Sequence, residues 1–179
     1  MSSIPFQGQN LHLFLDTETI GRRVGELAAE LNERYAESPV PPVLMPVLSG
    51  ALRFTAELLP RLNFAYDINC VKVSTYPEGD TPSLEPSFQL GFTLDLEQRP
   101  VIVLEDILDT GSTLTFLHAQ LAAVQTSEVY TAVLLHKVDA GSILRPNWVG
   151  FPVPEKFLVG YGLDYSGRLR HLHGIYSLE

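Results

Sequence analysis

Cysteine is almost absent from this sequence: Cys70 is the only one among 179 residues. A single cysteine cannot form an internal disulfide, and this usage is typical of a reducing compartment. It also excludes zinc sites and iron–sulfur clusters built from several cysteines. We therefore expect a cytoplasmic protein whose stability comes from an apolar core.

Long apolar runs and basic clusters are also missing. No segment approaches the roughly 18 apolar residues of a membrane span, and the first residues lack the pattern of a secretory signal. Acidic residues outnumber basic ones by 21 to 12, giving a formal net charge of −9. We therefore expect neither a membrane nor a nucleic acid as partner, but a local pocket can still bind a small anion.

The length and apolar content predict one globular domain over residues 1–179, in which helical and strand-like segments alternate. Helical spacing predicts helices at residues 17–37, 50–62 and 112–124. Apolar or alternating runs predict strands at residues 43–48, 68–74, 88–94, 101–104, 129–135, 148–151 and 157–159. This order is typical of an α/β fold with a mostly parallel, twisted sheet flanked by helices. A polar segment rich in proline and glycine, residues 75–87, has the length of a lid or binding loop.

Residues 101–114, VIVLEDILDTGSTL, are the most informative segment. Glu105 and Asp106 follow four apolar residues, and open α/β sheets bind ligands at the carboxyl ends of such strands. A loop containing Gly111 then opens a helix, whose free N–H groups and dipole favour an anion. The segment therefore predicts a phosphate cradle with two carboxylates beside it, which suit the vicinal hydroxyls of a ribose.

From the residues alone, two other ligand-binding loops are disfavoured and one alternative interpretation remains open. The segment lacks the Gly-Lys-Ser/Thr ending of a nucleoside triphosphate loop and the spaced glycines of a dinucleotide-binding loop. Alternatively, Asp109 and Thr110 only cap the helix, while Glu105 and Asp106 face solvent.

Four motifs together resemble those of one family. Residues 104–114 are similar to the phosphoribosyl-pyrophosphate (PRPP) motif of type I phosphoribosyltransferases. Residues 157–165, FLVGYGLDY, with the following RLR at 168–170 resemble the C-terminal motif of hypoxanthine(-guanine) phosphoribosyltransferases. Residues 47–51 and 73–76 match two further segments in the same order.

The resemblance implies a core at about residues 17–135 and a small hood formed by the N-terminal segment and about residues 145–179. It implies purine salvage, in which PRPP and hypoxanthine or guanine give IMP or GMP and pyrophosphate, with Mg²⁺. It also implies a homodimer or homotetramer.

The resemblance assigns the PRPP contacts residue by residue. Glu105 and Asp106 bind the ribose hydroxyls, and Asp109 is the general base near N7 of the purine. The 5′-phosphate is bound by a run of four residues, Thr110, Gly111, Ser112 and Thr113. Ser49 and Gly50 correspond to the pyrophosphate loop, where the family often has lysine in place of Ser49 and a cis peptide before it.

The purine, metal and loop contacts are assigned in the same way. Lys137 donates to the purine O6, Phe157 stacks on the base, and the Leu158 carbonyl meets the purine edge. Asp164 helps to hold Mg²⁺ together with Glu105 and Asp106, and Arg170 binds pyrophosphate. The loop that closes over the reacting centre begins at Ser74, Thr75 and Tyr76.

Two other functions fit parts of the pattern. A nucleotide-binding regulator could keep the phosphoribosyl site, but regulators of this kind usually need a nucleic-acid surface, which the net charge of −9 disfavours. A transferase for adenine or xanthine is the other alternative. Lys137 is a donor and therefore disfavours the 6-amino group of adenine, whereas xanthine differs at C2, near Leu158.

Overall fold

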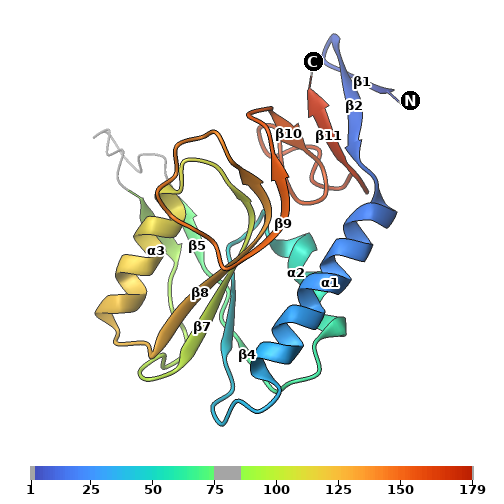
Figure 1. The fold of residues 1–179 in the computed structure, drawn as a ribbon. Coiled ribbons are helices and arrows are strands. Elements are labelled where there is room, and N and C mark those ends of the chain that lie inside the picture. Colours follow the sequence, from blue (N-terminus) through green and yellow to red (C-terminus); the bar gives the residue numbers. More distant parts are fainter. Residues whose placement is uncertain (1–2, 75–85, 179) are drawn as a thin grey trace, which may run out of the picture.

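A computed structural model describes residues 3–74 and 86–178 of the chain. Five parallel strands form the central sheet in the order β4-β3-β7-β8-β9 (Figure 1). The strands are β3 (Val43–Pro46), β4 (Asp67–Ile68), β7 (Pro100–Leu108), β8 (Glu128–Lys137) and β9 (Trp148–Val153). The predicted α/β class with a parallel sheet is confirmed.

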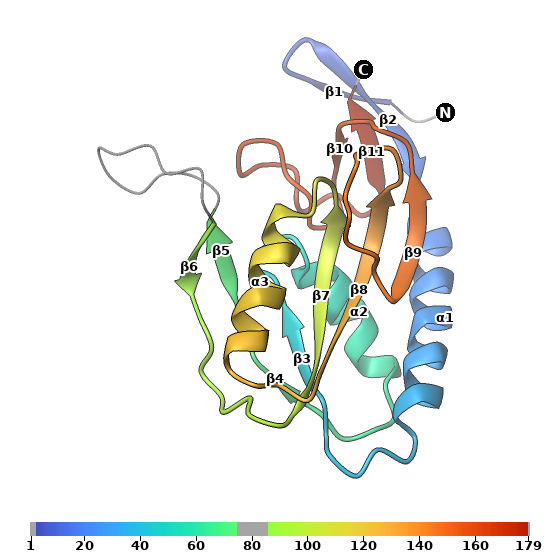
Figure 2. The same cartoon turned by 60° about the vertical axis from the view of Figure 1, so that its left-hand side comes forward.

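Helices cover both faces of this sheet. Figure 2 shows α3 (Ser112–Ala123) on one face and α1 (Thr17–Tyr35) with α2 (Leu52–Leu58) on the other. Alternate residues of each strand point to opposite faces, so Leu44 and Ile102 pack toward α1 and α2, while Val43 and Val101 pack toward α3. The short 3₁₀ helix η1 (Leu59–Arg61) follows α2.

A second, antiparallel sheet lies above the carboxyl ends of the central strands (Figure 1). Its order is β1-β2-β11-β10, and its strands are β1 (Ser3–Phe6), β2 (Gln9–Leu15), β10 (Leu158–Val159) and β11 (Ile175–Leu178). This sheet, which we call the hood, joins the two ends of the chain. The strands β5 (Lys72–Ser74) and β6 (Ser87–Leu90) form a separate antiparallel pair. Among the helices in the described part, none is long and apolar enough to span a membrane.

Several element boundaries differ from the predicted ones. The segment at 68–74 forms two short strands, and the helix that follows Gly50 ends at Leu58 and continues as η1, which contains Pro60. β6 ends at Leu90. Beyond it, the N–H groups of Thr93 and Leu94 donate to Asn69 Oδ1 and not to a partner strand. β9 joins the edge of the central sheet by pairing with β8, so the hood begins later than the expected boundary near residue 145. The hood strands β1, β2 and β11 were not predicted.

Candidate active site

Glu105 and Asp106 lie inside β7 rather than after its end. The predicted strand stopped at Leu104, but Glu105, Ile107 and Leu108 continue the parallel pairing with β8. The Glu105 side chain is almost fully buried, with 7% of the residue exposed. The alternative in which Glu105 faces solvent is therefore wrong, whereas Asp106 is partly exposed.

Burial changes the acidity of this pair. Loss of solvent raises the pKa of Glu105 well above its ordinary value, and the negative charge of Asp106 beside it raises it further. The pKa of Asp106 is also raised by burial, while hydrogen bonds from Glu105 and the backbone oppose the rise. Glu105 therefore retains a proton more readily than Asp106 does, and a ligand that offers hydroxyls or cations would stabilise both charged forms.

The start of α3 forms the next part of the site. Gly111 occupies the N-cap with φ at 83°, a left-handed conformation that favours glycine, and no side chain caps the helix. A Cβ on Gly111 would lie 2.5 Å from Ser142 Oγ, so the backbone passes very close to the loop after β8. The alternative in which Asp109 and Thr110 cap this helix is therefore wrong. The helix start instead borders a cavity of about 160 Å³, the α3 hollow, lined by Glu105, Ile107, Leu108, Asp109, Thr110, Gly111, Ser112, Thr113 and Leu114.

Lys137 and Asp109 meet beside this helix start. Lys137 is the last residue of β8, and Asp109 follows the last residue of the neighbouring parallel strand β7, so both side chains emerge at one edge of the sheet. Lys137 Nζ donates to Asp109 Oδ2 across 2.5 Å. The Lys137 side chain is only 13% exposed, whereas that of Asp109 is 47% exposed. A largely enclosed cation is thus held by a carboxylate that solvent can reach.

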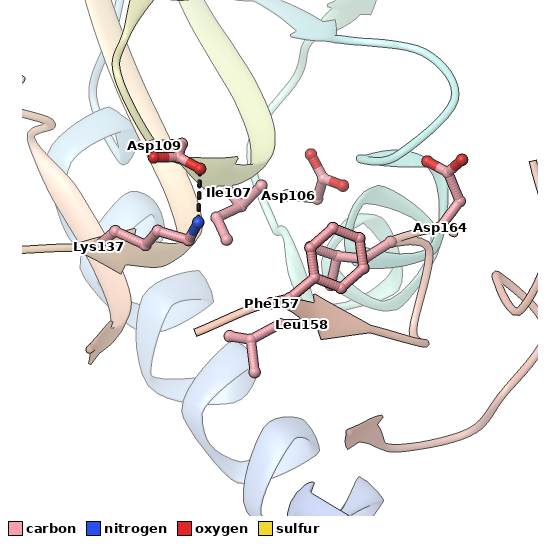
Figure 3. A pocket seen from close by; sticks show the side chains of 8 residues that line it. Asp106, Ile107, Asp109, Lys137, Phe157, Leu158 and Asp164 are labelled. Atoms are coloured by element: carbon pink, nitrogen blue, oxygen red, sulfur yellow. Dashed lines mark hydrogen bonds and ion pairs between the residues drawn. The ribbon is translucent and has the colours of Figure 1, made fainter. Parts of the chain in front are cut away.

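The two side chains open into a cavity of about 210 Å³ between the sheet and the hood, which we call the Lys137 hollow. Figure 3 shows the ring of Phe157 and the carboxylates of Asp106 and Asp164 around the same space. Phe157 leads into β10 and remains 52% exposed, while the adjacent Leu158 is buried. The lining residues are Asp106, Ile107, Asp109, Lys137, Phe157, Leu158, Leu163 and Asp164.

A third cavity, of about 530 Å³, lies on the other side of Asp106 and is called the Gly50 hollow. A Cβ on Gly50 would lie 2.1 Å from Asp106 Oδ2, so only glycine lets the loop after β3 approach this carboxylate. The Leu48–Ser49 peptide is cis, as expected. The lining residues are Val47, Leu48, Ser49, Gly50, Val73, Glu105, Asp106, Ile107, Asp109, Thr113, Asp164 and Arg170.

Arg170 is already engaged at the rim of the Gly50 hollow. Its guanidinium donates to the Gly162 carbonyl over 2.6 Å and pairs with Asp164 Oδ1 over 2.7 Å. The Asp164 carboxylate also accepts the N–H of Gly167 over 2.6 Å. The turn between β10 and β11 therefore presents Arg170 and Asp164 to the site as a neutralised pair.

The three hollows adjoin one another, because Ile107 and Asp109 line all of them. The fold thus brings most of the predicted site residues together. They are Glu105, Asp106, Asp109, Thr110, Gly111, Ser112, Thr113, Ser49, Gly50, Lys137, Phe157, Leu158, Asp164 and Arg170. Sequence reasoning missed Ile107, although its place between Asp106 and Asp109 in the motif was a usable signal. Ser74 is buried at the end of β5. Thr75 and Tyr76 lie outside the described residues.

Within residues 3–74 and 86–178, no group of three or more acidic, histidine or cysteine side chains is arranged to hold a metal ion. The carboxylates of Glu105, Asp106 and Asp164 nevertheless line the Gly50 hollow together. Oxygen donors of this kind suit Mg²⁺ that keeps its waters and is bound mainly through a substrate phosphate.

Comparison with known proteins identifies one family. Residues 13–166 match the family model for the phosphoribosyl transferase domain. Hypoxanthine-guanine phosphoribosyltransferase from Aquifex aeolicus is 35% identical over 175 residues, which cover 97% of this chain and 97% of the relative. Hypoxanthine phosphoribosyltransferase from Escherichia coli is 30% identical over 86% of both chains. The crystal structure of a hypoxanthine phosphoribosyltransferase from Staphylococcus aureus superposes with a TM-score of 0.86 at 30% identity, over 94% of this chain and 91% of that chain.

Proposed function

This chain belongs to the phosphoribosyltransferase family, and from that premise we propose the reaction and the roles of its residues. The reaction is purine salvage: the 5-phosphoribosyl group of PRPP is transferred to hypoxanthine, and to guanine, giving IMP or GMP and pyrophosphate. The relatives that support it are hypoxanthine and hypoxanthine-guanine phosphoribosyltransferases similar over most of their length.

The contact between Lys137 and Asp109 is the observation that carries the choice of purine. An ammonium donor and a carboxylate acceptor stand side by side, 2.5 Å apart, at the edge of the Lys137 hollow. A free 6-oxopurine protonated at N7 offers the complementary edge, with an acceptor at O6 next to a donor at N7. Adenine offers an amino donor in place of O6, which would face the ammonium, a group that can only donate. The pair therefore favours hypoxanthine and guanine.

Asp109 is also the general base in this proposal. As N9 of the purine forms its bond to C1′ of the ribose, the ring must lose the N7 proton. Asp109 reaches both the Lys137 hollow and the α3 hollow, so its carboxylate can accept that proton beside the new bond. Lys137 holds the carboxylate in place before the purine binds.

The remaining hollows fit the two ends of PRPP. The α3 hollow offers backbone N–H groups and the hydroxyls of Thr110, Ser112 and Thr113 to the 5′-phosphate. The Gly50 hollow, with Ser49 and Arg170 on its lining, would receive the pyrophosphate. Between them, Glu105 and Asp106 accept hydrogen bonds from the ribose hydroxyls. Ser49 provides no cation where the family often has lysine, so pyrophosphate depends more on Arg170 and the backbone.

The donor set fits Mg²⁺ held with the pyrophosphate. Glu105, Asp106 and Asp164 supply carboxylate oxygens at the Gly50 hollow. Bound there, Mg²⁺ would neutralise charge on the departing pyrophosphate. The protein residues hold the phosphates and the ribose while the bond from C1′ to pyrophosphate breaks, and the transition state resembles an oxocarbenium ion. Phe157 and the Leu158 carbonyl would place the purine against C1′.

We place this activity in the cytoplasm, in agreement with the single cysteine, and expect a homodimer or homotetramer by resemblance to the family. Light scattering on the purified chain tests the oligomeric state.

The proposed reaction is tested by incubating the chain with PRPP, Mg²⁺ and hypoxanthine or guanine, and measuring nucleotide and pyrophosphate. We expect IMP or GMP and pyrophosphate in equal amounts, and loss of turnover when EDTA removes Mg²⁺. Gly25→Ala is a matched control, because a Cβ at this partly buried helix position meets no atom within 4 Å. Binding of PRPP without turnover of any purine would contradict the proposal and favour a regulator.

A further inference from the structure

Three aromatic rings connect the N-terminal strand to the Lys137 hollow. The ring of Phe6, on β1, contacts that of Tyr165 with centroids 5.5 Å apart and planes at 79°. Tyr165 in turn contacts Phe157 with centroids 5.7 Å apart and planes at 76°. Both contacts have the edge-to-face geometry that aromatic pairs favour. Phe6 comes from the start of the chain and the other two rings from near its end, and the series ends at the cavity proposed for the purine.

The Phe157 ring needs such support. Its backbone is fixed, because the N–H of Leu178 donates to the Phe157 carbonyl over 3.2 Å. The side chain, however, is half exposed at the cavity. A ring without neighbours on its exposed side would keep its rotamer freedom until the purine binds. The side-chain entropy lost at that moment would weaken purine binding. The edge of Tyr165 restricts the ring beforehand.

Tyr165 is itself well anchored. Its N–H and carbonyl both bond to Arg168, each over 3.0 Å, which closes a tight turn directly after Asp164. Its side chain packs on the buried hood cluster of Leu11, Val159 and Leu169, as does that of Phe6. The position of the ring is therefore set by the hood core and not by solvent-exposed contacts.

We infer that Tyr165, supported by Phe6, is a positioning residue that holds the Phe157 ring ready to stack on the purine. The N-terminal strand thereby contributes to purine affinity without touching the purine. The inference rests on the proposed function, in which Phe157 stacks on the base. It predicts an effect confined to the purine, because PRPP has no base and is bound by the other two hollows.

IMP and PRPP are suitable probes, because they share the ribose 5-phosphate and differ in the base and the pyrophosphate. Titration calorimetry would give both affinities for the native chain, Tyr165→Ala, Tyr165→Phe and Phe6→Ala. We expect Tyr165→Ala to weaken IMP binding about 3- to 10-fold, as the loss of one aromatic pair implies. PRPP affinity should stay within about twofold, Tyr165→Phe should bind IMP like the native chain, and Phe6→Ala should lie between them.

A matched control separates positioning from general hood packing. Ile4 lies two residues before Phe6 on the same strand and packs on the same cluster, so Ile4→Ala removes packing but no ring of the series. We expect it to leave the ratio of IMP to PRPP affinity unchanged. A second test places Tyr165→Ala in a Phe157→Ala background, where it should cause no further loss of IMP affinity because the two rings act as one unit.

Two results would overturn the inference, and they are distinguishable. In the first, the native chain binds IMP and Tyr165→Ala either binds it equally well or loses IMP and PRPP affinity in the same proportion, the pattern expected of Ile4→Ala. Tyr165 then has no positioning role. If the native chain does not bind IMP at all, the proposed function fails and the inference fails with it.

Discussion

Lys137 and Asp109 form a direct ion pair at the ends of two neighbouring parallel strands, with Nζ 2.5 Å from Oδ2. The lysine is largely enclosed and the aspartate is open to the cavity. Removing either partner therefore has different consequences. Without Asp109, an enclosed ammonium loses its partner, whereas without Lys137 the carboxylate can still be solvated.

Lys137→Met should mainly impair recognition of the purine. Methionine has similar length but cannot donate to O6, and a hydrogen bond to a charged group is worth about 1.5–3 kcal/mol. We expect kcat/KM for hypoxanthine to fall roughly 10- to 100-fold, with little change in the KM for PRPP. Steady-state kinetics with each substrate varied in turn would check this. An unchanged KM and kcat for hypoxanthine would show that Lys137 does not contact the base.

Asp109→Asn should mainly impair chemistry. Asparagine preserves the volume and still offers an oxygen to Lys137, but it cannot take the N7 proton. We expect kcat to fall about 10²- to 10⁴-fold, the usual contribution of a general base. Calorimetric affinity for IMP should change much less than kcat does. A variant that retains kcat within a few-fold of the native value would rule out Asp109 as the base.

The fold and site were predictable to different extents. The strand and helix around residues 101–123 were predicted because their apolar periodicity is local. The hood strands were missed because β2 and β11 come from opposite ends of the chain, and pairing at long range leaves no local pattern. The contact between Tyr165 and Phe6 was missed for the same reason. The resemblance supplied Lys137 and Arg170, which charge patterns alone would leave as ordinary surface residues.

Glu105→Gln should stabilise the free protein while weakening PRPP binding. The folded state raises the pKa of Glu105 above its ordinary value of 4.5, so the unfolded chain releases this proton first as pH rises. Below about that ordinary value, Glu105 is protonated in both states and its burial does not lower the free energy of unfolding through ionisation. As pH rises from there toward the raised pKa of the folded state, the free energy of unfolding falls. Glutamine removes this ionisation cost and keeps the volume of the side chain. Substitutions at strained functional sites often stabilise a protein in this way.

Thermal unfolding measured over a range of pH would check this prediction. We expect the Tm of Glu105→Gln to exceed that of the native chain by about 2–4 °C at neutral pH, which corresponds to roughly 1 kcal/mol in a chain of this size. The difference should shrink as pH falls toward the ordinary glutamate pKa. A Tm difference that grows on acidification would contradict the assignment of a raised pKa.

Gly50→Ala should disrupt both stability and PRPP binding. The added Cβ would lie 2.1 Å from Asp106 Oδ2, so either the loop or the carboxylate must move. We expect a loss of about 1–3 kcal/mol in the free energy of unfolding, as overpacking usually causes, and a marked rise in the KM for PRPP. Gly25→Ala, whose new Cβ meets no neighbouring atom, should instead stabilise α1 by up to about 1 kcal/mol. Equal effects from the two changes would show that Gly50 is not needed for close approach.

Discrimination between purines at position 6 tests the central claim most directly. The measurement is kcat/KM for hypoxanthine and for adenine, each with saturating PRPP and Mg²⁺, in the native chain. A site built around a hydrogen bond to O6 leaves polar groups unpaired with the wrong base, and such sites discriminate by about 10⁴-fold or more. We predict efficient turnover of hypoxanthine and a ratio of this order over adenine. Comparable turnover of both purines would contradict the role given to the Lys137–Asp109 pair.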